Sequence, residues 1–330
     1  MKMVFDAAVL ATYPDIASVP DEIVRAARAQ GVNDASETLV FARQLEHIKN
    51  RLYKKQYAAL KGRGFVPFSN EAGPNKEFIT YRVWTGYTMA KLITNYSTDF
   101  ETVTASASEV FLKFYDFGNA YEYSMRDIQL ASAAGVPLAS MKAELARDGH
   151  ELAIDEAVAV GVPQVKTYGL TNHPNISILS VTTGTWSSAT GEQLVADLES
   201  IITQMEVLTL EIHRPDTILM STLAYRLIST KAFNSASGDK TVLQVFQARN
   251  PGISVQSWTK LATANATGTA GRIIAYKKDP TVIEFEMGEE FHAYPAMQRG
   301  MSMVTPCMSR FAGVAVHQPL ALAYFDNQAL

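Results

Sequence analysis

The segment from Phe78 to Trp84 alternates as a β-strand does, but large side chains would occupy both of its faces. Phe78, Thr80, Arg82 and Trp84 would lie on one face, and Ile79, Tyr81 and Val83 on the other. A second strand-like run follows from Met89 to Tyr96, with Thr85 to Tyr87 at the bend between them. The pattern predicts a long two-stranded hairpin within residues 61–96.

Such a hairpin cannot bury its own side chains, because an isolated pair of strands is at best marginally stable in water. Few apolar residues nearby in the sequence could cover it. We therefore expect it to contact another copy of the chain. The residues expected to make this inter-subunit contact are Phe78, Ile79, Tyr81, Val83 and Trp84.

The composition is that of a globular protein without the positive charge expected of a dedicated nucleic-acid-binding protein. The chain has 330 residues, 47% of them hydrophobic, and a formal net charge of -4. This charge argues against tight binding of nucleic acid, so only weak, non-specific contact with DNA is expected. Cys307 is the single cysteine, which excludes an internal disulfide. No apolar run reaches the roughly 18 residues of a membrane span, and the short apolar patch near the N-terminus does not indicate secretion, so we expect a soluble protein.

Two helical regions are expected in the first half of the chain. Residues 1–60 contain two interrupted helical stretches with a basic cluster in the second, and they predict an N-terminal arm. A longer helix is expected over residues 137–160, from Pro137 to the break at Gly161. Its expected apolar stripe contains Leu138, Met141, Leu145, Leu152 and Val160. Its opposite face, expected to be solvated, contains Lys142, Arg147, Asp148, Glu151 and Asp155.

The second half predicts a mixed helix and strand domain. Thr190 and Gln193 form a capping-box pattern before a helix with a regular apolar stripe through Leu198. A short buried strand is expected at Thr217 to Met220, followed by a helix capped by Ser221. Further strands are expected at Ile253 to Trp258, Arg272 to Tyr276, Val282 to Phe285, Ser302 to Val304 and Gly313 to Ala323. The fold class is therefore expected to be α+β.

No catalytic, cofactor-binding or metal-binding residues are predicted. The six histidines are scattered, and no two lie three or four residues apart as a helical metal pair requires. Gly62 and Gly64 lack the third glycine of a dinucleotide-binding turn, and no serine lies in a G-x-S-x-G setting. Cys307 is interpreted as a small core residue. An enzyme is therefore not expected.

Several local sequences, in this order, resemble the major capsid proteins of tailed double-stranded-DNA bacteriophages of the Hong Kong phage type. The segments that carry the resemblance are residues 84–90, 123–138, 168–174, 274–285 and 313–324. They are similar to the bend after the family's extended loop, the turn before its long "spine" helix, the turn after that helix, and its late strands. The resemblance covers about residues 60–330.

The resemblance implies an architecture and an assembly. It implies an N-terminal arm at 1–60 and an extended hairpin loop at 61–96. It implies a peripheral domain at 97–215 that includes the spine helix 137–160 and to which later strands return, and an axial domain with the closing strands at 216–330. It also implies self-assembly into the hexamers and pentamers of an icosahedral head that encloses DNA, with portal and scaffolding proteins as partners. No scaffolding extension of about a hundred residues is expected at the front, so the resemblance implies a separate scaffolding protein, or none.

The same resemblance implies location in the virion, and in the host cytoplasm during assembly. An encapsulin, the shell protein of a bacterial compartment with the same fold, is the alternative interpretation. A hydrolase with an unrecognised site is a weaker one.

Overall fold

The computed structural model describes residues 59–86, 88, 90, 102–134, 138–234 and 240–328, which belong to the unit Ala59–Leu330. The N-terminal arm expected at residues 1–60 lies outside the described residues except for its last two. The described residues form helices and strands in mixed order, so the predicted α+β class is confirmed. No helix in these ranges is both long and apolar enough to cross a membrane.

The first of three sheets is built around one long strand. Its strands are β1 (Phe68–Ser69), β4 (Tyr115–Ser124), β9 (Ile283–Ala293), β10 (Met297–Arg299) and β11 (Ser302–Val316). β11 pairs antiparallel with β4 along one edge, and with β10 and then β9 along the other. β1 runs parallel to β9.

The sequence predicted two strands where β11 is continuous. The expected strands were Ser302 to Val304 and Gly313 to Ala323, but β11 runs without a break through Pro306 and Gly313 and ends at Val316, and the end of the second expected strand belongs to a separate strand that begins at Leu322. Gly313 has a φ of 108°, a conformation that L side chains rarely adopt, and it lies where the register between β11 and β9 shifts. The glycine therefore allows a bulge within the strand instead of ending it.

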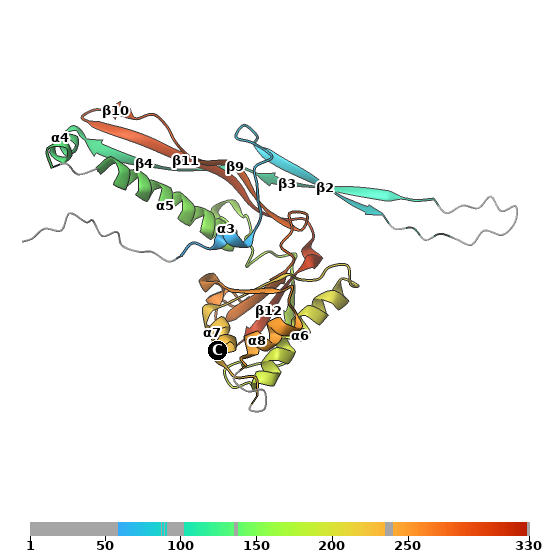
Figure 1. Cartoon of the computed structure of the whole chain (residues 1–330). Helices are drawn as coiled ribbons and strands as arrows, with labels where there is room; N and C mark the ends of the chain where they lie inside the picture. The colour runs from blue at the N-terminus through green and yellow to red at the C-terminus, as the bar shows by residue number, and fades with distance from the viewer. Residues whose placement is uncertain are drawn as a thin grey trace, which may run out of the picture. The chain divides into compact units, whose positions relative to one another are not determined.

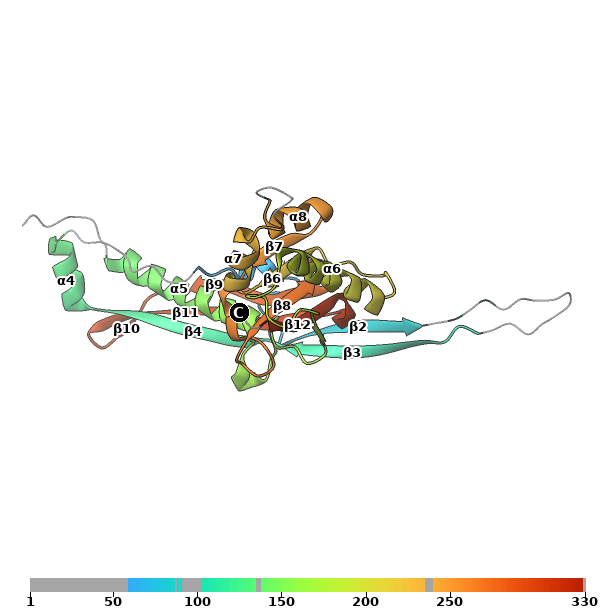
Figure 2. The ribbon, with the colours of Figure 1, turned by 90° about the horizontal axis from the view of Figure 1, so that it is seen from below.

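Helix α5 (Leu138–Ala159) lies along the first sheet, where it contacts β4, β9 and β11 (Figures 1 and 2). α4 (Met125–Ala134) follows directly after β4, and the short helix α3 (Gly62–Phe65) packs against α5. The helix predicted over residues 137–160 is thus confirmed to within one residue at each end, with Pro137 outside the described residues. The segment from Phe65 to Val66 belongs to the core and not to a projecting loop, because both side chains are buried.

The second sheet has the strand order β5-β12-β8-β6-β7. Its strands are β5 (Ser177–Ser180), β6 (Thr217–Met220), β7 (Ser254–Ser257), β8 (Gly271–Tyr276) and β12 (Leu322–Gln328). The helices of this region are α6 (Gly191–Leu208), α7 (Thr222–Thr230) and α8 (Val242–Arg249). Single turns of 3-10 helix occur at Pro163–Val165, Thr259–Thr263 and Pro319–Ala321.

The three central strands of the second sheet, β6, β8 and β12, are buried on both faces, and their residues alternate between two apolar cores. Ile218 and Met220 pack with α6 and α8, whereas Leu219 between them packs in the core that contains residues of α3, α5, β9 and β11. β8 and β12 alternate in the same way. This explains why β6 is a continuous run of apolar side chains, as predicted for a buried strand.

The caps predicted from the sequence are confirmed. The hydroxyl of Thr190 accepts a hydrogen bond from the Gln193 amide, and the Gln193 side chain accepts one from the Thr190 amide at 2.8 Å. Ser221 caps α7 by accepting from the Ala224 amide at 3.2 Å. These bonds satisfy amide groups that a helix leaves free in its first turn.

The third sheet is a hairpin of β2 (Phe78–Gly86) and β3 (Ala105–Lys113), hereafter the hairpin. The strand that pairs with β2 is β3, from Phe78↔Lys113 to Gly86↔Ala105, and not the second limb expected at Met89 to Tyr96, a segment of which the structure describes only Ala90. Gly86 continues the ladder instead of forming a bend, so the hairpin extends past the predicted limit at residue 96. In both views its described part extends away from the two other sheets (Figures 1 and 2).

Candidate functional site

The hairpin places aromatic side chains on an exposed surface. Phe78 and Trp84 of β2 are 54% and 72% exposed, and Phe111 of β3 is 66% exposed. Phe111 pairs with Thr80, so it lies on the same face as Phe78 and Trp84. We call this face, with Phe78, Phe111 and Trp84, the aromatic face.

The five residues predicted to contact another subunit are divided between the two faces of the hairpin. Phe78 and Trp84 lie on the aromatic face, whereas Ile79, Tyr81 and Val83 are partly buried on the other. Phe111 was missed, because its strand was not identified as the partner of β2. The alternation of residues 105–113 could have suggested that pairing.

Polar and cationic contacts lie between the aromatic side chains. Arg82 Nε lies 2.8 Å from Glu109 Oε1 in the ion pair across the two strands, and both side chains are largely exposed. The Lys113 ammonium lies 5.7 Å from the centre of the Phe78 ring. An exposed ion pair of this kind contributes little to folding stability, about 0–1 kcal/mol. The aromatic face is therefore held in place mainly by the backbone hydrogen bonds between β2 and β3.

The base of the hairpin is attached to the first sheet through Tyr81. The Tyr81 hydroxyl donates to the Val316 carbonyl at 3.3 Å, and its ring meets His317 edge-on with 4.5 Å between ring centres. Phe114, which follows β3, is buried, and its amide donates to the Glu77 carbonyl at 2.9 Å. The base of the hairpin is thus held by packing and hydrogen bonds.

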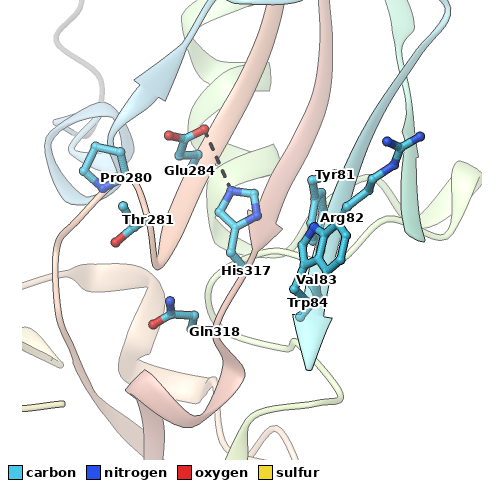
Figure 3. Close-up of a pocket in the computed structure, with 9 residues that line it drawn as sticks. All are labelled: Tyr81, Arg82, Val83, Trp84, Pro280, Thr281, Glu284, His317 and Gln318. Carbon is cyan, nitrogen blue, oxygen red and sulfur yellow. Dashed lines mark ion pairs between the residues drawn. The ribbon is translucent and has the colours of Figure 1, made fainter. Parts of the chain in front are cut away.

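An open cleft of about 450 Å³ lies between β2 and the end of β11 (Figure 3). Its lining consists of Tyr81, Arg82, Val83, Trp84, Pro280, Thr281, Glu284, His317 and Gln318. In Figure 3 Glu284 and His317 face each other across two strands, and the hairpin residues stand opposite them. The cleft is therefore bounded by charged and aromatic groups from distant parts of the sequence.

Glu284, Glu286 and His317, hereafter the Glu–Glu–His cluster, gather beside this cleft. Each offers one ligand atom within 4.8 Å of the other two. Burial, with the nearby Glu284 carboxylate adding to it, raises the pKa of Glu286 from its ordinary 4.5 to about 7. Histidine spacing along a helix does not indicate this cluster, since its members come from β9 and from the residue that follows β11. The Glu-x-Glu spacing on one strand was the available signal.

The face of α5 that is buried differs from the face predicted. Leu145 and Leu152, assigned to the apolar stripe, are 50% and 55% exposed, whereas Asp155, assigned to the solvated face, is 4% exposed. The Gly62 amide donates to Asp155 Oδ1 at 2.7 Å, and His150 Nδ1 lies 2.7 Å from Ser309 Oγ. The buried face thus combines apolar residues such as Ile154 and Val158 with polar groups whose partners come from distant segments.

Cys307 is buried among the strands of the first sheet, as expected for a core residue, and burial raises the pKa of its thiol.

Solved structures of phage capsids are similar to this chain. "The capsid of Myoviridae Phage XM1" is 19% identical, with a TM-score of 0.77, over 88% of this chain and 99% of that chain. A structure from Mycobacterium phage Adephagia is 13% identical, with a TM-score of 0.62, over 90% and 100%. No curated protein sequence matches. The fold is therefore that of the tailed-phage capsid proteins of the Hong Kong phage type, as predicted.

The family of the chain is identified from its sequence. Residues 88–327, most of the chain, match the family model described as Major capsid protein. The chain belongs to the major capsid protein family, and it is a subunit of a bacteriophage head shell. This family assignment supports the predicted phage head more than the encapsulin alternative.

Proposed function

We propose that the hairpin is the strap by which each subunit binds a neighbouring copy in the shell. The single observation that carries this is the aromatic face: three large rings stand exposed on a two-stranded element that extends from the two other sheets. Exposed apolar patches of this kind are characteristic of interaction surfaces. Aromatic residues and Arg are also enriched in the buried centre of protein interfaces.

The attachment at Tyr81 supports the same role. A strap must be held at its base and must keep its outer surface free for the neighbour. Tyr81 and Val83 are partly buried against the first sheet, whereas Phe78 and Trp84 are exposed. Ile79, Tyr81 and Val83 would then orient the hairpin, and the aromatic face would make the contact.

Hexamers and pentamers follow from this arrangement in our proposal. A hairpin that binds a different surface on the next copy makes a head-to-tail interface, which closes into a ring when the rotation permits. Rings of five and six subunits then form the icosahedral head. We further propose portal and scaffolding proteins as assembly partners, weak contact with packaged DNA, assembly in the host cytoplasm, and no catalytic turnover.

The two larger sheets fit the two domains of the family. In our proposal the sheet of β4, β9, β10 and β11 with α5 is the peripheral domain. The sheet of β5–β8 and β12 with α6–α8 is the axial domain. α6 packs in one core with β6, β8 and β12, so it joins the axial domain although residues 97–215 were expected to be peripheral.

The experiment changes the aromatic face without changing either core. W84S/F111S should give a folded subunit that no longer closes into shells, because the apolar contact is lost while the buried residues remain. Circular dichroism reports folding, and sedimentation with negative-stain microscopy reports shells. The control W84F/F111L keeps apolar groups at both positions and should assemble. Intact shells from W84S/F111S, or loss of folding, would contradict the strap.

A further inference from the structure

The Glu–Glu–His cluster consists of three ligand types that the fold brings together from two segments. Glu284 and Glu286 are two residues apart on β9, so their side chains share one face of the strand. His317 directly follows β11, whose Ala315 pairs with Glu284. One ligand atom from each residue lies within 4.8 Å of the other two.

Glu286 gives an independent indication of a ligand. Its side chain is 4% exposed, and no donor among the described residues reaches its Oε2 atom. The Glu286 carboxyl group lies beside Ser69 and Glu284, but its Oε2 atom makes no hydrogen bond within the described residues. A buried carboxylate oxygen without a hydrogen bond, next to a second carboxylate, is costly for the folded subunit. A cation bound between the two carboxylates would satisfy the orphan oxygen and remove their repulsion.

The spacing of Glu284 and His317 fits a shared ion better than a direct bond. Glu284 Oε2 lies 3.8 Å from His317 Nε2, which exceeds the length of a hydrogen bond. Ligand atoms of one zinc ion lie about 2.0–2.2 Å from the metal, so two of them are at most about 4.4 Å apart. The observed 3.8 Å is within that limit, and Figure 3 shows the two side chains turned toward each other.

We propose that Glu284, Glu286 and His317 bind a first-row transition cation such as Zn²⁺ or Mn²⁺. One imidazole nitrogen with two carboxylates favours this class over Mg²⁺ and Ca²⁺, which prefer oxygen ligands alone. The remaining coordination positions would be filled by water, because Glu284 and His317 line the open cleft. The cation also reaches the site by this route.

A bound cation would stiffen the base of the hairpin. His317 as a ligand would lose the freedom to rotate, and its ring is the one that Tyr81 contacts edge-on. The metal site is independent of the strap proposal, because its three ligands belong to the first sheet or to the residue that follows it. If W84S/F111S still assembles, the metal site stands without the strap.

The test is metal binding by the full-length chain after removal of metals with EDTA. Titration calorimetry with ZnCl₂ and MnCl₂, followed by metal analysis after dialysis, should show one ion per chain, and MgCl₂ should give none. E286Q keeps the shape of the side chain and should bind Zn²⁺ at least tenfold more weakly. H317Q should do the same.

The control is H292Q, since His292 is an exposed histidine on the same strand, and it should bind as the wild type does. The thermal midpoint with and without ZnCl₂ gives a second readout: Zn²⁺ should raise it in the wild type and leave E286Q unchanged. If E286Q or H317Q has an altered circular dichroism spectrum, E284Q is used in its place, because the Glu284 side chain is partly exposed. Absence of bound Zn²⁺ in the wild type, or wild-type binding by the ligand variants, would overturn the proposal.

Discussion

The backbone amide of Gly62 donates a 2.7 Å hydrogen bond to Oδ1 of Asp155, a residue 93 positions away in the sequence. This bond joins the short helix α3 to the buried face of α5. Ion-assisted hydrogen bonds in buried positions are among the stronger ones in proteins. The segment around α3 is thus attached to α5 by the carboxylate of Asp155.

Removal of this carboxylate should destabilise the subunit. D155A leaves the Gly62 amide without its acceptor, and we expect a loss of about 1–3 kcal/mol in the free energy of unfolding. Chemical denaturation of the purified subunit measures it. The matched control is E156Q, whose side chain pairs with Lys260 at the surface, and which should change stability by less than about 0.5 kcal/mol. Equal effects from the two variants would contradict the buried role of Asp155.

Gly62 offers a complementary test from the other side of the same contact. A methyl group at this position would lie 2.9 Å from Asp155 Oδ1 and 3.3 Å from the Asp155 Cα atom. Because the second atom belongs to the backbone, α3 must move, and G62A should cost about 1–3 kcal/mol. G64A is the control, since a methyl group at Gly64 meets nothing within 4 Å. Thermal midpoints of the two variants give the comparison.

Leu198 lies in the centre of the apolar stripe of α6 and is fully buried with residues of β6 and α8. L198A should lower the free energy of unfolding by about 2–5 kcal/mol, because it removes buried methyl groups and leaves a cavity. Denaturant titration measures the effect. V207A, at an exposed position near the end of the same helix, should stay within about 0.5 kcal/mol of the wild type. A wild-type value for L198A would show that the core adjusts to fill the space.

Arg272 and Asp326 form a buried two-pronged ion pair between β8 and β12, with Nε–Oδ1 and Nη2–Oδ2 both at 2.7 Å. Nη1 of Arg272 also donates to the Thr171 carbonyl at 2.6 Å. R272M would leave Asp326 without its countercharge and should cost about 3–5 kcal/mol. R272M/D326L should cost less than the sum of the two single variants, since neither charge remains. Additive losses in a double-mutant cycle would show that the two groups do not interact energetically.

Glu286 should make the subunit less stable as the pH rises. Its pKa in the folded chain is raised to about 7, so the folded state holds the proton more tightly than the unfolded state. The resulting stability is complete below the ordinary pKa of 4.5 and is lost as the pH rises through 7. Between these two pH values the contribution of Glu286 to the free energy of unfolding falls by about 3 kcal/mol.

The measurement is the free energy of unfolding in EDTA between pH 5 and 8. E286Q should remove this part of the pH dependence, whereas E289Q, on the same strand, should keep the wild-type slope. Parallel curves for wild type and E286Q would show that Glu286 titrates as it does in the unfolded chain.

Local signals predicted the elements whose determinants are close in sequence. Thr190 and Gln193 are three residues apart, and the cap that they form depends on no distant residue, so α6 could be predicted well. β6 was predicted for a similar reason, because four consecutive buried residues are characteristic of a strand covered on both faces. The class of fold followed from such elements.

Pairing between distant segments could not be predicted in this way. β2 and β3 pair across residues 87–104, and nothing in the alternation of Phe78 to Trp84 identifies the partner. The orientation of α5 is a similar case, since the partner of the buried Asp155 carboxylate is the amide of Gly62, 93 positions away in the sequence. The Glu–Glu–His cluster also depends on which strand lies beside β9. The inter-subunit role of the hairpin stays a prediction, because one chain alone does not contain its neighbour.

The unbroken ladder between β4 and β11 has a mechanical consequence. Ten consecutive pairs join the two strands, from Ser302↔Ser124 to Phe311↔Tyr115. Backbone hydrogen bonds in an antiparallel pair run across the strands. Tension that pulls the two strands in opposite directions along their length therefore loads all of these bonds together, as in shear, and does not open them one at a time. The first sheet is thus strongest along the direction of β11, and a lattice that transmits force along that strand would resist stretching most.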